Sequence, residues 1–136
     1  MKAKDNEIVL LYNSEKQKDK EVLGYAETLK DHKLNATDVS KSKLTERQIA
    51  EIASDLNKNV EGVVDDSSEK YKTEIKGKSF SDEELLKLLT ENPDLLTTPV
   101  AYMNDQAFVV DSQYSFINKD LDVGGVKSKQ ANQFEK

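Results

Sequence analysis

The residues most able to do chemistry in this sequence lie in the polar turn Asn13–Lys18, directly after the apolar run Ile8–Tyr12. A turn that leads from a buried strand into a helix is a common position for an active site. This turn has no glycine, histidine or cysteine, so it offers neither a phosphate-cradling loop nor a thiol nucleophile. Its lysines could help a helix N-terminus to hold an anion. Because acidic residues alternate with these lysines, we expect a solvated surface instead.

Composition narrows the chemistry further. The chain has 136 residues, enough for one domain with a real core, and it contains no cysteine. That absence excludes disulfides, thiolate zinc sites and catalysis by a thiol. His32 is the only histidine, and the acidic run at Asp65, Asp66 and Glu69 lacks the spacing and glycine of an EF-hand loop. We therefore expect neither a metal nor a cofactor.

Charge and hydropathy indicate the setting of the chain. The net charge is -6, which gives no general attraction to nucleic acid. The uncharged apolar runs are far too short to cross a bilayer, and the first seven residues lack the apolar segment of a signal peptide. We expect a cytoplasmic, monomeric protein with no membrane partner.

Two strands and two helices are expected in the first half of the chain. Glu7–Tyr12 is a continuous apolar run from Ile8 onward, as in a strand buried on both faces, whereas Leu34–Val39 alternates apolar and polar residues, as in a more exposed strand. Apolar residues then recur at helical spacing in two places. Each of these helices is expected to begin at a capping-box pair: Ser14 with Gln17, and Thr45 with Gln48.

The second half is expected to hold a short helix, a polar loop, a longer helix and a β-hairpin. A final short helix and a polar tail with one docking residue, Phe134, are expected after them. We therefore predict one domain over residues 1–120 and a tail over residues 121–136. The expected segments are Val60–Val64, the loop Asp65–Lys78, a helix that begins at Ser81 with Glu84 and stops at Pro93, the strands Val100–Met103 and Ala107–Val110, and a helix with Tyr114, Phe116 and Ile117.

The order of these elements favours one fold class. A β-α-β half, an intervening helical stretch and a closing hairpin are typical of a thioredoxin-like α/β fold, although other α/β arrangements share that order. The expected architecture is a three-layer sandwich. It has a mixed sheet of about four strands, flanking helices and a helical insertion.

The stretch Phe80–Val110 resembles the C-terminal half of the ArsC family, which comprises the glutaredoxin-type arsenate reductases and the Spx proteins. The shared pattern is a Ser-Asp-Glu-Glu-Leu helix start, an Asn-Pro pair, two leucines, a proline and the hairpin, and its most specific part is Asn92–Val100. The resemblance extends more weakly back to Glu7 and forward to Phe116. It implies a thioredoxin-like fold with a cis peptide bond before Pro99.

The resemblance also implies where catalytic residues should stand, and this sequence departs from it there. Lys16 occupies the position of the family's nucleophilic cysteine. The three arginine positions of the family's arsenate reductases fall on Asp65, Thr98 and Asp111. The whole chain has one arginine, Arg47, so no shift of the alignment restores the set. Without a thiol, the family's thiol-dependent reduction of arsenate is impossible.

Two functions remain open at this point. The first is a non-catalytic binding or regulatory protein, since Spx relatives act by contacting RNA polymerase. Its binding residues would be Asn13, Lys16, Thr98 and Pro99, with a protein or peptide partner at the edge beside Pro99. The second is an arsenate reductase of the glutathione/glutaredoxin type, or a related oxidoreductase, in which another group replaces the thiol. Lys16 is the only candidate, and a lysine cannot perform thiol–disulfide exchange.

Overall fold

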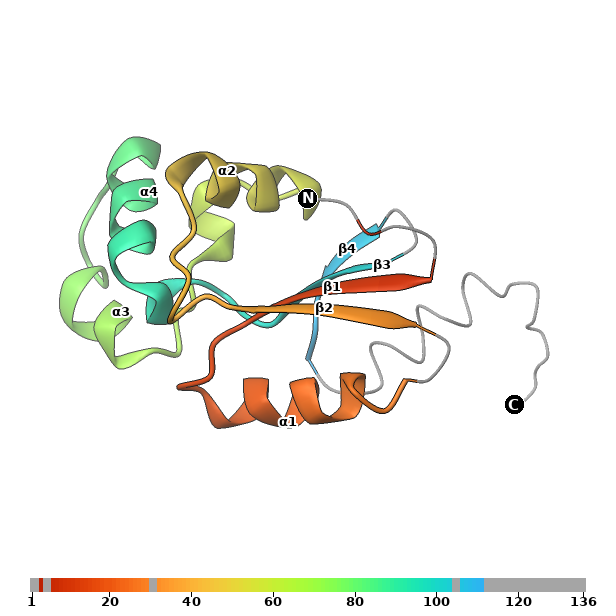
Figure 1. Ribbon diagram of the computed structural model, residues 1–136. Helices are drawn as coiled ribbons and strands as arrows, with labels where there is room; N and C mark the ends of the chain where they lie inside the picture. The colour runs from red at the N-terminus through yellow and green to blue at the C-terminus, as the bar shows by residue number, and fades with distance from the viewer. Residues whose placement is uncertain (1–2, 4–5, 30–31, 104–105, 112–136) are drawn as a thin grey trace, which may run out of the picture.

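The computed structural model describes residues 3, 6–29, 32–103 and 106–111 (Figure 1). Strands and helices alternate in the first half of the chain, helices follow, and a hairpin closes the described part. In order, the elements are β1 (Glu7–Tyr12), α1 (Gln17–Ala26), β2 (Lys33–Asp38), α2 (Glu46–Asp55), the 3-10 helix η1 (Val60–Val63), α3 (Glu69–Glu74), α4 (Asp82–Glu91), the 3-10 helix η2 (Pro93–Leu95), β3 (Val100–Met103) and β4 (Gln106–Val109).

The strands form one mixed sheet in the order β2-β1-β3-β4. β1 pairs with β2 in parallel and with β3 in antiparallel, and β3 and β4 form the antiparallel hairpin. Leu10 in the middle of β1 lies opposite Ala36 of β2 and Ala101 of β3. The four-stranded mixed sheet confirms the predicted fold class.

Helices cover both faces of this sheet, with α1 on one side and α2 and α4 on the other (Figure 1). Side chains alternate between the two faces along β1. Ile8 and Leu10 belong to the apolar cluster that α1 completes, whereas Val9 and Leu11 belong to the larger cluster under α2, η1 and α4. β1 is therefore buried on both faces, as its continuous apolar run predicts, and the three layers are present.

Helix starts agree with the sequence in two of three cases. Thr45 with Gln48 and Ser81 with Glu84 form complete capping boxes at α2 and α4. The predicted capping box of Ser14 with Gln17 is wrong. α1 begins two residues later than that motif implies, with Lys16 as its N-cap and no side-chain cap, because the Ser14 hydroxyl is engaged with Ser40.

The predicted loop Asp65–Lys78 contains a helix, α3, so that prediction is wrong. The Ser68 hydroxyl caps α3 by accepting a hydrogen bond from the Tyr71 amide at 3.1 Å. None of the residues of α3 is fully buried, which explains why no apolar periodicity announced it. The predicted helix around Tyr114, the tail with Phe134 and the domain boundary at residue 120 lie outside the described residues.

Among the residues that the structure describes, no helix is both long enough and apolar enough to cross a bilayer.

Candidate functional site

The turn between β1 and α1 is built around Asn13, which is fully buried. Its side-chain oxygen accepts a hydrogen bond from the Glu15 amide at 2.8 Å, and its carbonyl accepts one from the Lys16 amide at 3.0 Å. Its own amide donates to the Asp19 carboxylate at 2.8 Å. These bonds set the direction in which the chain enters α1, with Lys16 at the helix start.

Lys16 makes a long-range ion pair. Its ammonium lies 2.8 Å from the Asp65 carboxylate and donates a second hydrogen bond to the Leu96 carbonyl at 3.0 Å. Both charged side chains are only about one-fifth exposed, at 19% and 21%. The structure therefore brings together two positions that the sequence analysis singled out separately, the nucleophile position and one arginine position.

Asp65 is fixed independently of Lys16. Its amide donates to the Leu95 carbonyl at 2.6 Å, and its second carboxylate oxygen accepts bonds from the Ser67 amide and hydroxyl at 3.0 and 2.6 Å. Burial opposes ionisation, but the hydrogen bonds from Lys16 and Ser67 outweigh it and hold the pKa of Asp65 below its usual value. Asp65 is thus a carboxylate at neutral pH, placed to neutralise Lys16.

A second carboxyl group, Asp19, lies beneath the helix start and is only 1% exposed. Burial raises the pKa of Asp19, and the nearby Thr98 hydroxyl, the Asn13 amide and the Lys16 charge act in the opposite direction. Asp19 is one of the acidic residues that alternate with the lysines of this turn, and the expectation of a solvated surface is wrong for it. Asp19 stands three residues before Val22 and seven before Ala26, on the buried face of α1, and that spacing was the available signal.

The peptide bond between Thr98 and Pro99 is cis, as the resemblance implies. Thr98 is 7% exposed, and its hydroxyl makes no hydrogen bond of standard geometry. Neither its backbone amide nor its carbonyl has a hydrogen-bond partner within the described part of the chain. The side-chain amide nitrogen of Asn13 is also buried without a partner. Buried polar groups usually have partners, so this is a place where a water molecule or a ligand is expected.

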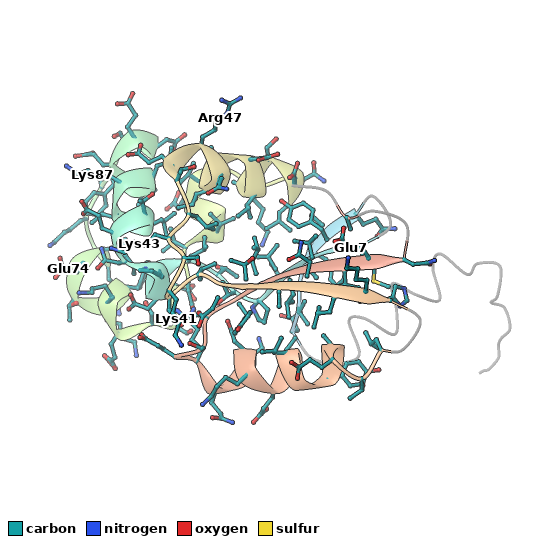
Figure 2. The ribbon with its side chains drawn as sticks, viewed as in Figure 1. Glu7, Lys41, Lys43, Arg47, Glu74 and Lys87 are labelled. Atoms are coloured by element: carbon teal, nitrogen blue, oxygen red, sulfur yellow. The ribbon has the colours of Figure 1, made fainter. Side chains whose placement is uncertain are left out.

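The third arginine position, Asp111, comes directly after Val110, whose amide donates to the Pro99 carbonyl at 2.9 Å. Asp111 follows β4 and is exposed. Arg47 is exposed on α2 and points outward, away from α1 (Figure 2). The chain's single arginine therefore does not reach the start of α1.

A polar clamp that the sequence analysis missed holds the loop after β1 against the loop after β2. The Asp38 carboxylate accepts hydrogen bonds from the Ser14 amide at 3.1 Å and from the Ser40 amide and hydroxyl at 3.0 and 2.7 Å. Slight burial works against ionisation, but these bonds outweigh it and lower the pKa of Asp38 to about 2. The only hint in the sequence was the clustering of Asp38 and Ser40 after a strand.

Within the described part of the chain, His32 and the acidic residues do not form a metal centre. No group of three potential metal ligands is present among residues 3, 6–29, 32–103 and 106–111. Tyr102 is a buried aromatic residue with a polar partner. Its hydroxyl donates to the Asp55 carboxylate at 2.7 Å, and burial followed by that bond raises its pKa.

Solved structures show which known proteins have this geometry. An arsenate reductase from Vibrio cholerae matches with a TM-score of 0.72 and 20% sequence identity, over 85% of this chain and 98% of that chain. This chain has the arsenate reductase fold. A possible arsenate reductase from Streptococcus mutans matches with a TM-score of 0.63 and 13% identity, over 82% and 97%. No protein-family model and no curated protein matches the sequence.

The matches cover nearly the whole length of both of these structures, so the fold is shared over almost all of each. The resemblance recognised at Phe80–Val110 is confirmed as a shared fold. At these identities the match says nothing about activity. The chemistry has to be argued from the residues at the start of α1.

Proposed function

We propose that this chain is a non-catalytic protein of the arsenate reductase fold that acts by binding another molecule. The observation that carries the proposal is the ion pair between Lys16 and Asp65 at the start of α1. On the resemblance, this is where a reductase would hold its cysteine and one arginine. A thiolate beside a guanidinium is replaced by an ammonium beside a carboxylate, so the signs of the two charges are exchanged.

This exchange removes both steps of the reductase chemistry. A lysine amine cannot form or exchange a disulfide, and the chain has no cysteine elsewhere to supply one. An oxyanion such as arsenate would also meet the carboxylate of Asp65 where the reductase has a cation, and Asp65 already neutralises Lys16. The site is electrostatically satisfied without a ligand.

Binding is proposed at the Thr98–Pro99 segment, where the backbone amide and carbonyl of Thr98 have no hydrogen-bond partner in the described chain. Extended peptides are recognised by pairing with such backbone groups, with side-chain pockets adding specificity. Asn13 contributes a further unpaired donor. The partner class that fits is an extended peptide, either free or as part of a protein.

The test of the non-catalytic role is an arsenate reduction assay with glutathione and glutaredoxin supplied. The purified chain is expected to give no turnover above a reaction without it, at enzyme concentrations where a genuine reductase is readily detected. Measurable turnover that follows the concentration of the chain would refute the proposal.

The test of the binding role is a titration of the isotope-labelled chain with S-methylglutathione, an extended peptide that cannot react as a thiol. The amide signals of Thr98 and its neighbours are expected to shift in a saturable way. Thr98→Val keeps the shape of the side chain but loses the hydroxyl, and should weaken the binding severalfold. Shifts confined to other regions, or none at millimolar peptide, would exclude this edge.

A further inference from the structure

A cleft of about 530 Å³ lies between η1, α3 and the start of α4. Val64 and Asp66, the two neighbours of Asp65, line it. Its volume lies within the range of small-molecule sites. Neither the ion pair at Lys16 nor the proposed peptide edge makes use of this cleft.

The apolar part of the lining combines buried aliphatic residues with two aromatic rings. Ile75 and Leu85 are buried, at 8% and 5% exposure, whereas Tyr71 and Phe80 are half-buried. All four are part of, or pack against, the larger apolar cluster of the molecule. The rings are thus held by the core while part of their surface remains open to the cleft.

The polar part of the lining carries charges that are not used within the chain. Glu61 and Asp66 come from the segment around η1, and Lys78 comes from the segment after α3. All three are exposed, and none has an ion pair or a side-chain hydrogen bond within the described residues. Two carboxylates against one ammonium, in a chain of net charge -6, favour a positively charged ligand over an anion.

We propose that this cleft binds an organic cation with an apolar body, such as an arylalkyl amine. The apolar body packs on Ile75 and Leu85, and the cationic group lies against the faces of Tyr71 and Phe80 within reach of the two carboxylates. Lys78 opposes the ligand's charge, but its long flexible side chain is exposed and can direct the ammonium into water. The proposal is independent of the one for the Thr98–Pro99 segment.

Three probes of nearly equal size and different charge test the proposal: phenethylamine, 2-phenylethanol and phenylacetate. Binding to the full chain is followed by chemical shift changes of the amides that line the cleft. The amine is expected to bind tightest, the alcohol more weakly and the carboxylate weakest. Binding of the alcohol or the carboxylate as tightly as the amine, or no binding of the amine at 20 mM, would overturn the proposal.

Variants of the lining residues test whether the preference for the amine arises in this cleft. The double variant Glu61→Gln with Asp66→Asn is expected to weaken phenethylamine binding about tenfold and to leave 2-phenylethanol binding unchanged. The matched control is Glu74→Gln, because Glu74 lies on the outer side of α3 and is not part of the lining (Figure 2). Equal weakening by the control and the double variant would show a general charge effect and contradict the site.

The aromatic contribution has its own variant. Tyr71→Leu keeps an apolar side chain against the core but removes the ring face, and should weaken amine binding about threefold more than alcohol binding. An unchanged amide spectrum away from the cleft would show that the variant folds. If Tyr71→Leu weakened both probes equally, the cation would not lie against the ring.

Discussion

At the scale of single residues, the Lys16–Asp65 pair decides what the start of α1 can do. The pair is about one-fifth exposed, so solvent screens it less than an ordinary surface ion pair. Lys16 also donates to the Leu96 carbonyl, and Asp65 also accepts from Ser67. Each charge keeps additional hydrogen bonds, which offsets part of the cost of desolvating it.

Lys16→Met should therefore destabilise the chain by about 1–2 kcal/mol, since it removes charge-assisted hydrogen bonds but keeps most of the apolar stem. The free energy of unfolding in urea measures the loss. Lys18→Met is the control, because Lys18 is an exposed lysine on the same helix. A double-mutant cycle with Asp65→Asn should give a coupling of about 1 kcal/mol. Equal losses in the Lys16 and Lys18 variants would show that the pair contributes nothing.

The Asp38 clamp predicts an acid-sensitive contribution to stability. The pKa of Asp38 is about 2 in the folded chain, below its ordinary value of 3.8. A depressed pKa stabilises the fold above the unfolded-state value, and that stabilisation is lost as the pH falls from about 4 to about 2. Asp38→Asn should therefore destabilise the chain at pH 7, and its difference from the wild type should shrink over that interval. Urea unfolding at pH 7, 4 and 3 measures it.

Asp19 should act in the opposite sense in the same experiment, because its pKa is raised. Its ionised form is disfavoured in the folded chain, so stability falls as the pH rises from 3.8 through the folded-state pKa.

The control for the Asp38 variant is Asp82→Asn, which changes an exposed acid in the first turn of α4. A constant difference between the Asp38 variant and the wild type from pH 7 to 3 would show that the clamp does not depend on the charge.

At the scale of elements, two helices depend on side-chain caps that the sequence displays. Ser81→Ala removes the hydroxyl that accepts from the Glu84 amide, and should cost about 1 kcal/mol. Ser42→Ala is the matched control, since Ser42 is an exposed loop serine whose hydroxyl has no hydrogen bond in the described structure. Thermal unfolding compares the two variants. A Ser81 variant as stable as the Ser42 variant would mean that the cap is energetically silent.

The capping motif also shows where local sequence stops being informative. Thr45 and Ser81 cap helices as predicted, whereas Ser14 has the same spacing and does not. The difference comes from Asp38 and Ser40, which bind Ser14 from 24 and 26 residues away. α3 was missed for a related reason, because it has a capping serine but no buried face. Local sequence patterns fail to predict a helix start where long-range polar contacts determine it.

The candidate site also has features that the sequence predicted and features that it could not predict. The identity of Lys16, Asp65, Thr98 and Pro99 as the positions to inspect came from the resemblance alone. The resemblance did not predict the ion pair between Lys16 and Asp65, because 49 residues separate them in the sequence. The unpartnered groups of Thr98 depend on how three segments meet, and no spacing in one strand or helix encodes that.

At the scale of the whole molecule, β1 is the element on which both halves of the core depend. Leu10 of β1 is completely buried between the sheet and α1. Leu10→Ala should destabilise the chain by about 2–5 kcal/mol through lost apolar burial and an unfilled cavity. Asn35→Ala on β2 is the control, because Asn35 is exposed. Denaturant unfolding with unchanged m-values measures the effect, and a loss below about 1 kcal/mol would contradict a tightly filled core under α1.

The Lys16 contacts have a consequence for how fast the chain folds and unfolds. They connect segments 49 and 80 positions apart, so they can form only after the sheet and the segment that carries Asp65 have come together. Interactions that form after the rate-limiting step slow unfolding and leave folding unchanged. Lys16→Met should therefore raise the unfolding rate about tenfold with little change in the folding rate, as stopped-flow measurements would show. A residue that stands in a nucleophile's position would then set the lifetime of the folded state.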